Sequence, residues 1–192
     1  MKQQFESLNC DERKKALDVF EAIKNRRSVR AFTDEPVSDT KIRKLIDAAR
    51  RAPSAGNIQP WEFVIIRGQE VKRELCKVAG NQNFIEEAPV VIVVCANTLR
   101  SEHGYGSRGV TLYCLQDTAA ATQNMLLAAQ AMGLATCWVG AFSEEEVIKV
   151  LNIPKSIRPV AIIPVGHPAR KPKIRLRRPL NEIIHHEIFG RK

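Results

Sequence analysis

Residues 89–96 (PVVIVVCA) restrict the fold of this chain more than any other segment, because β-branched side chains occupy nearly every position. Such a run is typical of a strand buried in the middle of a sheet. Three further apolar runs have the length and pattern of buried strands. They cover residues 61–67, 134–139 and 158–165.

Helices are expected before and between these strands. Apolar residues recur at helical spacing in residues 11–25, 38–52, 71–78, 112–132 and 144–151. The longest of these helices has a single charge, Asp117, and is apolar almost all round, so we expect it to be buried on several sides. The order of helices and strands predicts a three-layer α/β protein.

Residues 98–110 are expected to form a polar, Gly-rich loop. Within it, Gly104–Gly109 matches the pattern G-x-G-x-x-G. A dinucleotide-binding motif of this kind follows a strand directly and has an acidic residue about 20 positions later. Here the motif starts well after the strand that ends at Asn97, and the later position is Ala129. These departures exclude a Rossmann site.

The composition favours one intracellular domain. A chain of 192 residues with 44% apolar residues can bury a core of its own, and no apolar run reaches the roughly 18 residues of a membrane span. The polar N-terminus lacks the apolar segment of a secretory signal. Five widely spaced cysteines predict neither a disulfide framework nor a zinc site. We therefore expect a soluble, cytoplasmic protein.

The net charge predicts an anionic partner. Thirty Lys and Arg residues against 21 Asp and Glu residues give a formal charge of +9. A nucleic acid, an acidic membrane surface or a phosphate-bearing cofactor would each fit this charge. One basic segment alternates with a period of two, so an extended backbone would send Arg26, Ser28 and Arg30 to one side.

A second basic segment lies in the C-terminal tail. Lys173, Arg175 and Arg177 alternate with Ile174 and Leu176, which places three cations on one face of an extended strand. The two segments could close on a single phosphate, because a guanidinium donates two parallel hydrogen bonds to it. The alternative is a solvated basic surface.

No constellation for hydrolysis or metal binding is present in the sequence. The four histidines lack metal-ligand spacing, and Cys95 and Cys137 lie in strand runs where buried cysteines are ordinary. We therefore predict no metal site and no catalytic side chain. A chain with phosphate-binding residues but no acid, base or nucleophile suits an enzyme whose cofactor performs the chemistry.

Several motifs in order resemble the nitroreductase family of flavoproteins. They are NRRSVRAF (25–32), APSAGNIQPW (52–61), APVV (88–91), the helix from Asp117 to Ala129, GL (133–134), CWVGAF (137–142) and the basic tail. The resemblance spans residues 19–181, and the motifs are far more specific together than singly. The chain is short for the family, because it lacks the long inserted helices of larger relatives.

The resemblance implies an α+β fold, a three-layer sandwich with a mainly antiparallel central sheet. Residues 1–192 would form one domain, with a flexible segment 1–10 and a basic tail 167–192 that contributes to the flavin site and the dimer. The family forms homodimers with FMN at the subunit interface, which also explains the apolar helix at 112–132.

The resemblance also assigns candidate cofactor-binding residues. On one subunit they are Arg26, Arg27, Ser28, Arg30, Gln82, Gly140, Ala141, Lys173 and Arg175. Asn81 is an alternative to Gln82, and Arg177 an equally good candidate for the phosphate. The partner subunit would lay Pro53, Ser54, Ala55 and Asn57 against the flavin. Tyr105 and Arg108 are candidate substrate contacts.

The function implied is an FMN-dependent NAD(P)H oxidoreductase that reduces nitroaromatic or quinone-like acceptors in a ping-pong cycle. FMN carries the chemistry, with NADH or NADPH as reductant, and no nucleic acid or membrane is a partner. Reductive dehalogenation or flavin fragmentation on the same fold is an alternative. A basic nucleic-acid-binding module is another, although only 6% of the residues are aromatic and no helix-turn-helix pattern is visible.

Overall fold

The computed structural model describes residues 18–170 and 172–192. In chain order the elements are α2 (Val19–Asn25), α3 (Asp39–Ala49), η1 (Ala55–Asn57), β1 (Trp61–Ile66), α4 (Gln69–Val78), α5 (Phe84–Glu87), β2 (Val90–Asn97), α6 (Thr98–Arg108), η2 (Gly109–Tyr113), α7 (Cys114–Ala131), β3 (Ala135–Thr136), α8 (Glu144–Leu151), β4 (Ile157–Gly166) and α9 (Leu180–Ile183). The predicted flexible segment 1–10, Cys10 and the start of the helix predicted from Asp11 lie outside the described residues.

The four strands form one sheet in the order β1-β2-β4-β3, and every neighbouring pair is antiparallel. β2 lies inside the sheet, and its residues from Val90 to Ala96 are buried. This position confirms the prediction from the β-branched run, because a strand covered on both faces has no side for polar residues.

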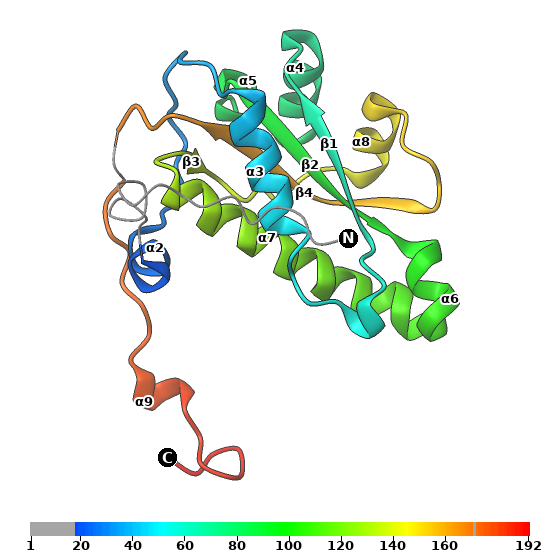
Figure 1. Ribbon diagram of the computed structural model, residues 1–192, viewed down its shortest axis with the longest axis vertical. Helices are drawn as coiled ribbons and strands as arrows, with labels where there is room; N and C mark the ends of the chain where they lie inside the picture. Colours follow the sequence, from blue (N-terminus) through cyan, green and yellow to red (C-terminus); the bar gives the residue numbers. More distant parts are fainter. Residues whose placement is uncertain (1–17, 171) are drawn as a thin grey trace, which may run out of the picture.

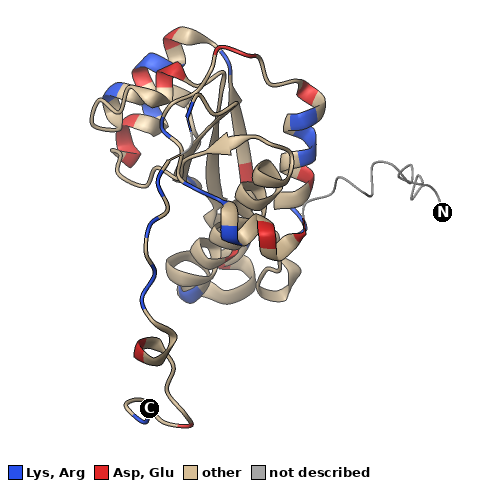
Figure 2. Ribbon diagram, turned by 90° about the vertical axis from the view of Figure 1, so that its left-hand side faces the viewer, with Lys and Arg blue, Asp and Glu red and all other residues tan. Residues whose placement is uncertain are grey.

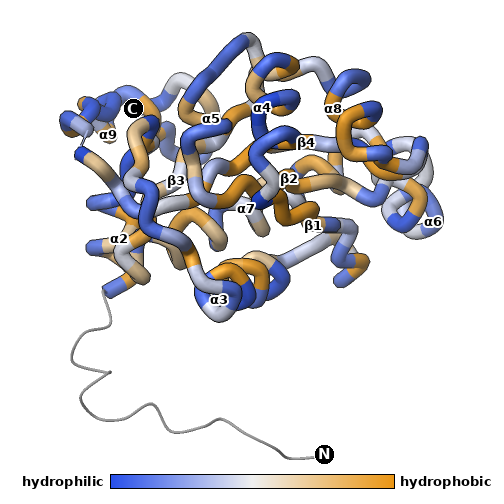
Figure 3. Tube along the Cα trace, turned by 90° about the horizontal axis from the view of Figure 1, so that it is seen from above, coloured by the Kyte–Doolittle hydropathy of each residue, from blue (hydrophilic) through white to orange (hydrophobic). Residues whose placement is uncertain are grey.

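Helices cover both faces of the sheet (Figure 1). Val90, Ile92 and Val94 of β2 pack in one core with residues of α3 and α7. The alternate residues of β2 pack in a second core with residues of α4, α5 and α8. Figure 3, seen from above, shows α3 on one side of the sheet and α4, α5 and α8 on the other. The predicted three-layer α+β sandwich with an antiparallel sheet is confirmed.

The prediction of a loop at residues 98–110 is wrong. Asn97 caps α6 by accepting a hydrogen bond from the Arg100 backbone N–H (3.2 Å), and a π-helical turn, η2, leads from α6 into α7. The glycines allow close packing here. A Cβ at Gly109 would overlap the Ser101 carbonyl group, and Gly106 has φ of 54° where α6 bends.

The predicted strand at 134–139 is shorter than expected, and the basic segment around Arg26 and Arg30 pairs through isolated bridges. Residues 26–32 form isolated bridges, Ser28 to Thr136 and Phe32 to Pro168, in place of a strand. In the run 134–139, β3 covers Ala135–Thr136, and Val139 forms one bridge to Ile162. β3 is the edge strand of the sheet, and Ser28 bridges to it from outside. At this edge the continuous ladder is replaced by single bridges.

The apolar face predicted for the first helix points outward. Val19, Phe20 and Ile23 of α2 are more than half exposed, Phe20 to 75%, whereas Ala22 is buried. The side chains with the largest apolar surface therefore have no cover within the described residues of this chain.

Among the described residues, no helix is both long and apolar enough to cross a bilayer.

One ion pair ties α8 to β4 and makes a testable contribution to stability. Arg158 donates two hydrogen bonds of 2.8 Å to the Glu144 carboxylate, and this bonding lowers the pKa of Glu144. Both side chains are partly exposed, so we expect Glu144→Gln to cost about 0.5–1 kcal/mol of unfolding free energy at neutral pH. Because the folded pKa is depressed, the contribution is complete above the ordinary glutamate pKa and disappears as the pH falls through the folded pKa. Denaturant unfolding of the wild type and of Glu144→Gln at pH 7 and near pH 3 measures this contribution. A difference in unfolding free energy that stays constant between the two pH values would contradict the ion pair's role.

Candidate functional site

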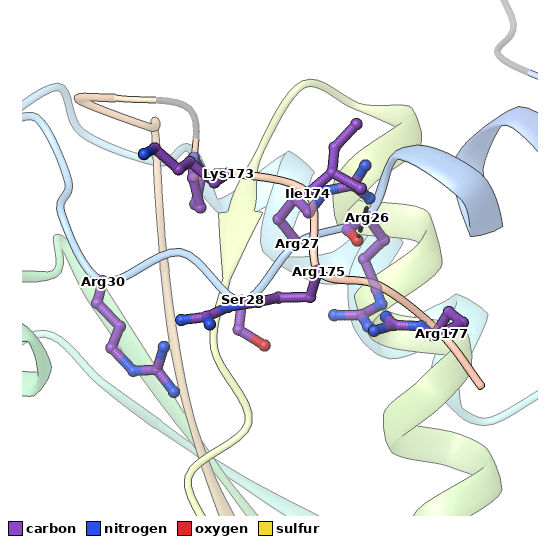
Figure 4. Close-up of a pocket in the computed structure, with 9 residues that line it drawn as sticks. Arg26, Arg27, Ser28, Arg30, Lys173, Ile174, Arg175 and Arg177 are labelled. Carbon is purple, nitrogen blue, oxygen red and sulfur yellow. Dashed lines mark hydrogen bonds between the residues drawn. The ribbon is translucent and has the colours of Figure 1, made fainter.

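The two basic segments from opposite ends of the described chain meet at one pocket with a volume of about 650 Å³ (Figure 4). The pocket is lined by Arg26, Arg27, Ser28, Arg30, Pro172, Lys173, Ile174, Arg175 and Arg177. Its size is within the range of small-molecule and cofactor sites.

Pairing at the sheet end explains why the segments meet. The Val29 N–H donates to the Thr136 carbonyl at 2.9 Å, which holds the first segment beside β3. The Thr33 N–H donates to the His167 carbonyl (2.9 Å), and the Ala169 N–H donates to the Ala31 carbonyl (3.0 Å). These bonds are antiparallel, so the chain leaving β4 runs back along the first segment. Figure 2 shows basic residues following one another along the tail below this point.

The pocket is strongly positive. It has six basic side chains, and no acidic side chain is among its described lining residues. Burial and the nearby Arg177 and Arg27 guanidiniums lower the pKa of Arg26. Arginine nevertheless stays charged in proteins. An anion with two charges would relieve the repulsion that Arg26 and Arg177 exert on each other.

Arg27 differs from its neighbours. Its Nη1 donates to the carbonyls of Lys24 (2.6 Å) and Arg26 (2.9 Å) at the end of α2. These bonds satisfy carbonyls that have no partner within the helix and place a cation at the negative end of its dipole. Arg27 lines the pocket, but the structure gives its guanidinium a helix-capping role that the sequence did not indicate.

Arg30 lines the basic pocket and also lies near the second group of predicted cofactor-binding residues, which comprises Gln82, Gly140 and Ala141. Its guanidinium lies 5.6 Å from the centre of the Phe84 ring. Nearby in the chain, Gln82 Nε2 donates to the Ala79 carbonyl at 2.8 Å and to the Ala141 carbonyl at 3.4 Å. Gly140 is exposed, and a Cβ there would meet no atom within 4 Å among the described residues. Space is therefore open in front of the Gly140 backbone.

Asn81 has φ of 56° and donates its backbone N–H to the Cys76 carbonyl at 3.0 Å, so it ends α4. Of the two candidates, Gln82 has a side-chain hydrogen bond to residues 138–142 among the described residues, to the Ala141 carbonyl.

The Cys137 thiol lies near enough to Arg30 and Arg26 to interact with their charges. The side chain is buried, and burial raises the pKa of its thiol although Arg30 and Arg26 oppose the shift. A neutral, buried thiol is a poor nucleophile. The expectation that Cys137 is an ordinary buried cysteine agrees with this burial.

The remaining predicted residues lie elsewhere in this chain. Pro53, Ser54, Ala55 and Asn57 belong to the loop around η1, and the Ala55 N–H donates to Asp117 Oδ1 near the start of α7 (3.1 Å). Arg27, which lines the basic pocket, also lines a neighbouring pocket with Gln130 and Gly133, at the other end of α7. At 1.5 Å per residue, the helix from Asp117 to its end separates the two groups by about 20 Å. One chain therefore does not bring them together.

Tyr105 and Arg108 lie beside this loop. Tyr105 stacks edge-on against Tyr113 with ring centres 5.1 Å apart, and its hydroxyl lies over Gly56. Arg108 Nε donates to the Tyr113 hydroxyl at 2.9 Å. The two candidate substrate contacts thus form a small aromatic and cationic cluster against residues 55–57.

Comparison with known proteins gives consistent matches. A family model described as "Nitroreductase family" matches residues 23–81 and 74–167. An FMN reductase (NADPH) from Bacillus subtilis is 31% identical over 186 residues, which cover 90% of this chain and 75% of the relative. The NfrA1 nitroreductase structure from B. subtilis superposes with a TM-score of 0.83 at 30% identity, covering 90% of this chain and 75% of that one. An NADPH:FMN oxidoreductase from Vibrio harveyi, solved with NAD+, has a TM-score of 0.83 at 28% identity, with 91% and 79% covered.

Proposed function

Because the chain belongs to the nitroreductase family, we propose that it is an FMN-dependent NAD(P)H oxidoreductase that reduces nitroaromatic or quinone-like acceptors. The observation that carries this proposal is the pocket that six basic side chains line, without an acidic one among its described lining residues. A phosphate monoester with two charges fits that donor set, and the pocket volume of about 650 Å³ suits a cofactor.

The phosphate of FMN binds between the two basic segments. Arg26 and Ser28 approach from one side, and Lys173 and Arg175 from the tail, with Arg177 as the alternative to Arg175. Guanidiniums bind phosphate with paired hydrogen bonds, whereas Lys173 contributes a point charge. The binding of one dianion also removes the repulsion around Arg26.

Arg30 and residues 138–142 would hold the ring of FMN. When bound, FMN supplies the acceptor and donor of hydride that the protein side chains lack. Arg30 would provide positive charge beside the pyrimidine part of the ring. The reduced ring tends to carry its negative charge there, and the guanidinium stabilises that charge. The backbone N–H groups of Gly140 and Ala141 would orient the ring, and Gln82 holds their turn through its bond to the Ala141 carbonyl.

The protein functions as a homodimer in which the partner supplies the loop of residues 53–57. Within one chain this loop lies about 20 Å from the basic pocket along α7, so a second copy is needed to cover the ring. Exposed apolar side chains support dimerisation, because Phe20 of α2 and Leu176 and Phe189 of the tail are 75%, 95% and 93% exposed. Tyr105 and Arg108 would then stand beside the ring and contact the acceptor.

FMN titration at two salt concentrations tests the proposal against a nucleic-acid-binding module. We expect one FMN per chain, with an affinity that falls less than tenfold between about 50 and 200 mM salt, because a single buried phosphate is contacted. A nucleic-acid site with six or more phosphate contacts loses about a thousandfold or more over that range. Failure to bind FMN, together with oligonucleotide binding of that salt sensitivity, would contradict the proposal.

A further inference from the structure

The loop of residues 54–59 has an unusual backbone. Gly56, Asn57 and Gln59 all have positive φ, at 53°, 57° and 55°. Glycine adopts this region freely, but each of the other two residues costs free energy there. A loop with several such residues keeps its shape only when its surroundings hold it.

Besides its own turn bonds and those of the Gln59 side chain, this loop is held by hydrogen bonds to Ser54, Arg100 and Asp117. Within it, Ser54 Oγ accepts from the Gln59 N–H at 3.0 Å. From α6, Arg100 donates to the Ile58 carbonyl through Nη2 (3.0 Å) and Nε (3.3 Å), with its side chain exposed. From α7, Asp117 Oδ1 accepts from the Ala55 N–H at 3.1 Å.

Asp117 differs from the other two because it is a carboxylate in an apolar core. It is 7% exposed, and its second oxygen, Oδ2, has no hydrogen-bond partner among the described residues. Burial raises the pKa of Asp117. For the packing of α7, an apolar residue of similar size would serve better, because a buried carboxylate with one partner is costly. Its single hydrogen bond goes to the loop.

We propose that Asp117 is a positioning residue: through the Ala55 N–H it fixes the 54–59 loop in the shape that covers the flavin of the partner subunit. This inference rests on the proposed function, since it assigns the loop to that flavin. Asp117 touches neither cofactor nor substrate, so it acts on the reaction only through the loop.

Two substitutions remove the hydrogen bond from opposite sides. Asp117→Leu keeps the forked shape of the side chain, at a larger volume, but removes the acceptor. Ala55→Pro removes the donor, and the backbone accommodates it because Ser54 is extended (φ −142°, ψ 152°) and Ala55 begins η1. Asp117→Asn keeps the acceptor oxygen without the charge. Thr118→Val is the matched control, because Thr118 is also buried in α7 but bonds the Cys114 carbonyl at 2.7 Å.

The measurements are amide hydrogen exchange of residues 54–59 without FMN, the FMN dissociation constant and the visible circular dichroism of bound FMN, all on the full chain. For Asp117→Leu and Ala55→Pro we expect about tenfold faster exchange, about tenfold weaker FMN binding and an altered flavin spectrum. Asp117→Asn and Thr118→Val should keep the wild-type values.

Unchanged loop exchange, affinity and flavin spectrum in Ala55→Pro or in folded Asp117→Leu would overturn the inference. Equal losses in Thr118→Val would overturn it too, because they would show a general effect of the α7 core. A wild-type protein that binds no FMN would instead overturn the proposed function, and this inference with it.

Discussion

The double variant Arg26→Ala/Arg175→Ala is expected to be a folded protein that binds FMN at least 100-fold more weakly than the wild type. The two guanidiniums come from the two segments that line the basic pocket. Each charge-assisted hydrogen bond to phosphate contributes about 1.5–3 kcal/mol, so the loss of both corresponds to about 10²–10⁴ in the dissociation constant. Titration of apoprotein with FMN, followed by flavin fluorescence, measures it.

The matched control is Arg43→Ala/Lys44→Ala, which removes the same charge from the outer face of α3. Both residues are exposed there, and neither lines the basic pocket. We expect this control to bind FMN with the wild-type affinity. Stoichiometric, tight FMN binding by the Arg26/Arg175 variant would rule out the phosphate assignment. Equal weakening of FMN binding in the control would show that the loss in the Arg26/Arg175 variant is only an effect of net charge.

Mixed dimers should show that each flavin site uses two chains. In one chain the variant Arg26→Ala/Arg175→Ala removes the phosphate contacts. In the other, Gly56→Val distorts the loop, because Gly56 has φ of 53° and a Cβ there would lie 2.6 Å from the Tyr105 hydroxyl. Both homodimers should be inactive. The mixed dimer pairs the intact pocket of one chain with the intact loop of the other, so it should regain about one FMN per dimer and half the wild-type activity.

Differently tagged chains, co-expressed and purified through both tags, isolate the mixed dimer. Size-exclusion chromatography confirms its composition before the flavin content is measured. A dimer without FMN or activity would contradict the assignment of the loop to the partner's site. Activity in the Gly56→Val homodimer would show that the loop's shape is not needed.

The sequence predicted the parts of the fold that depend on local pattern. The β-branched run became β2, and the alternation of Arg26, Ser28 and Arg30 with the tail cations anticipated that both segments line one pocket. These predictions succeed because a strand's burial and an extended segment's two faces follow from side-chain periodicity alone.

Other features depend on contacts that local pattern does not encode. The glycines at 104–109 suggested a loop, yet Gly104 lets α6 pack closely on Ile58, and Gly109 of η2 packs closely on the Ser101 carbonyl of α6. Asp117 is visible in the sequence as the single charge of an apolar helix, but its partner, the Ala55 N–H, lies 62 residues away. The apolar face of α2 was predicted correctly as a pattern, and its exposure shows that the described residues of one chain do not cover it.

The central claim is that this chain binds FMN and passes electrons from a reduced nicotinamide through it. Its most direct test is the visible absorption spectrum of the purified protein under anaerobic conditions, before and after addition of NADH or NADPH. The account predicts flavin bands equivalent to about one FMN per chain, which bleach when one of the nicotinamides is added and return when a quinone or nitroaromatic compound follows. A colourless protein that takes up no added FMN, or a flavin that neither nicotinamide reduces, would contradict it.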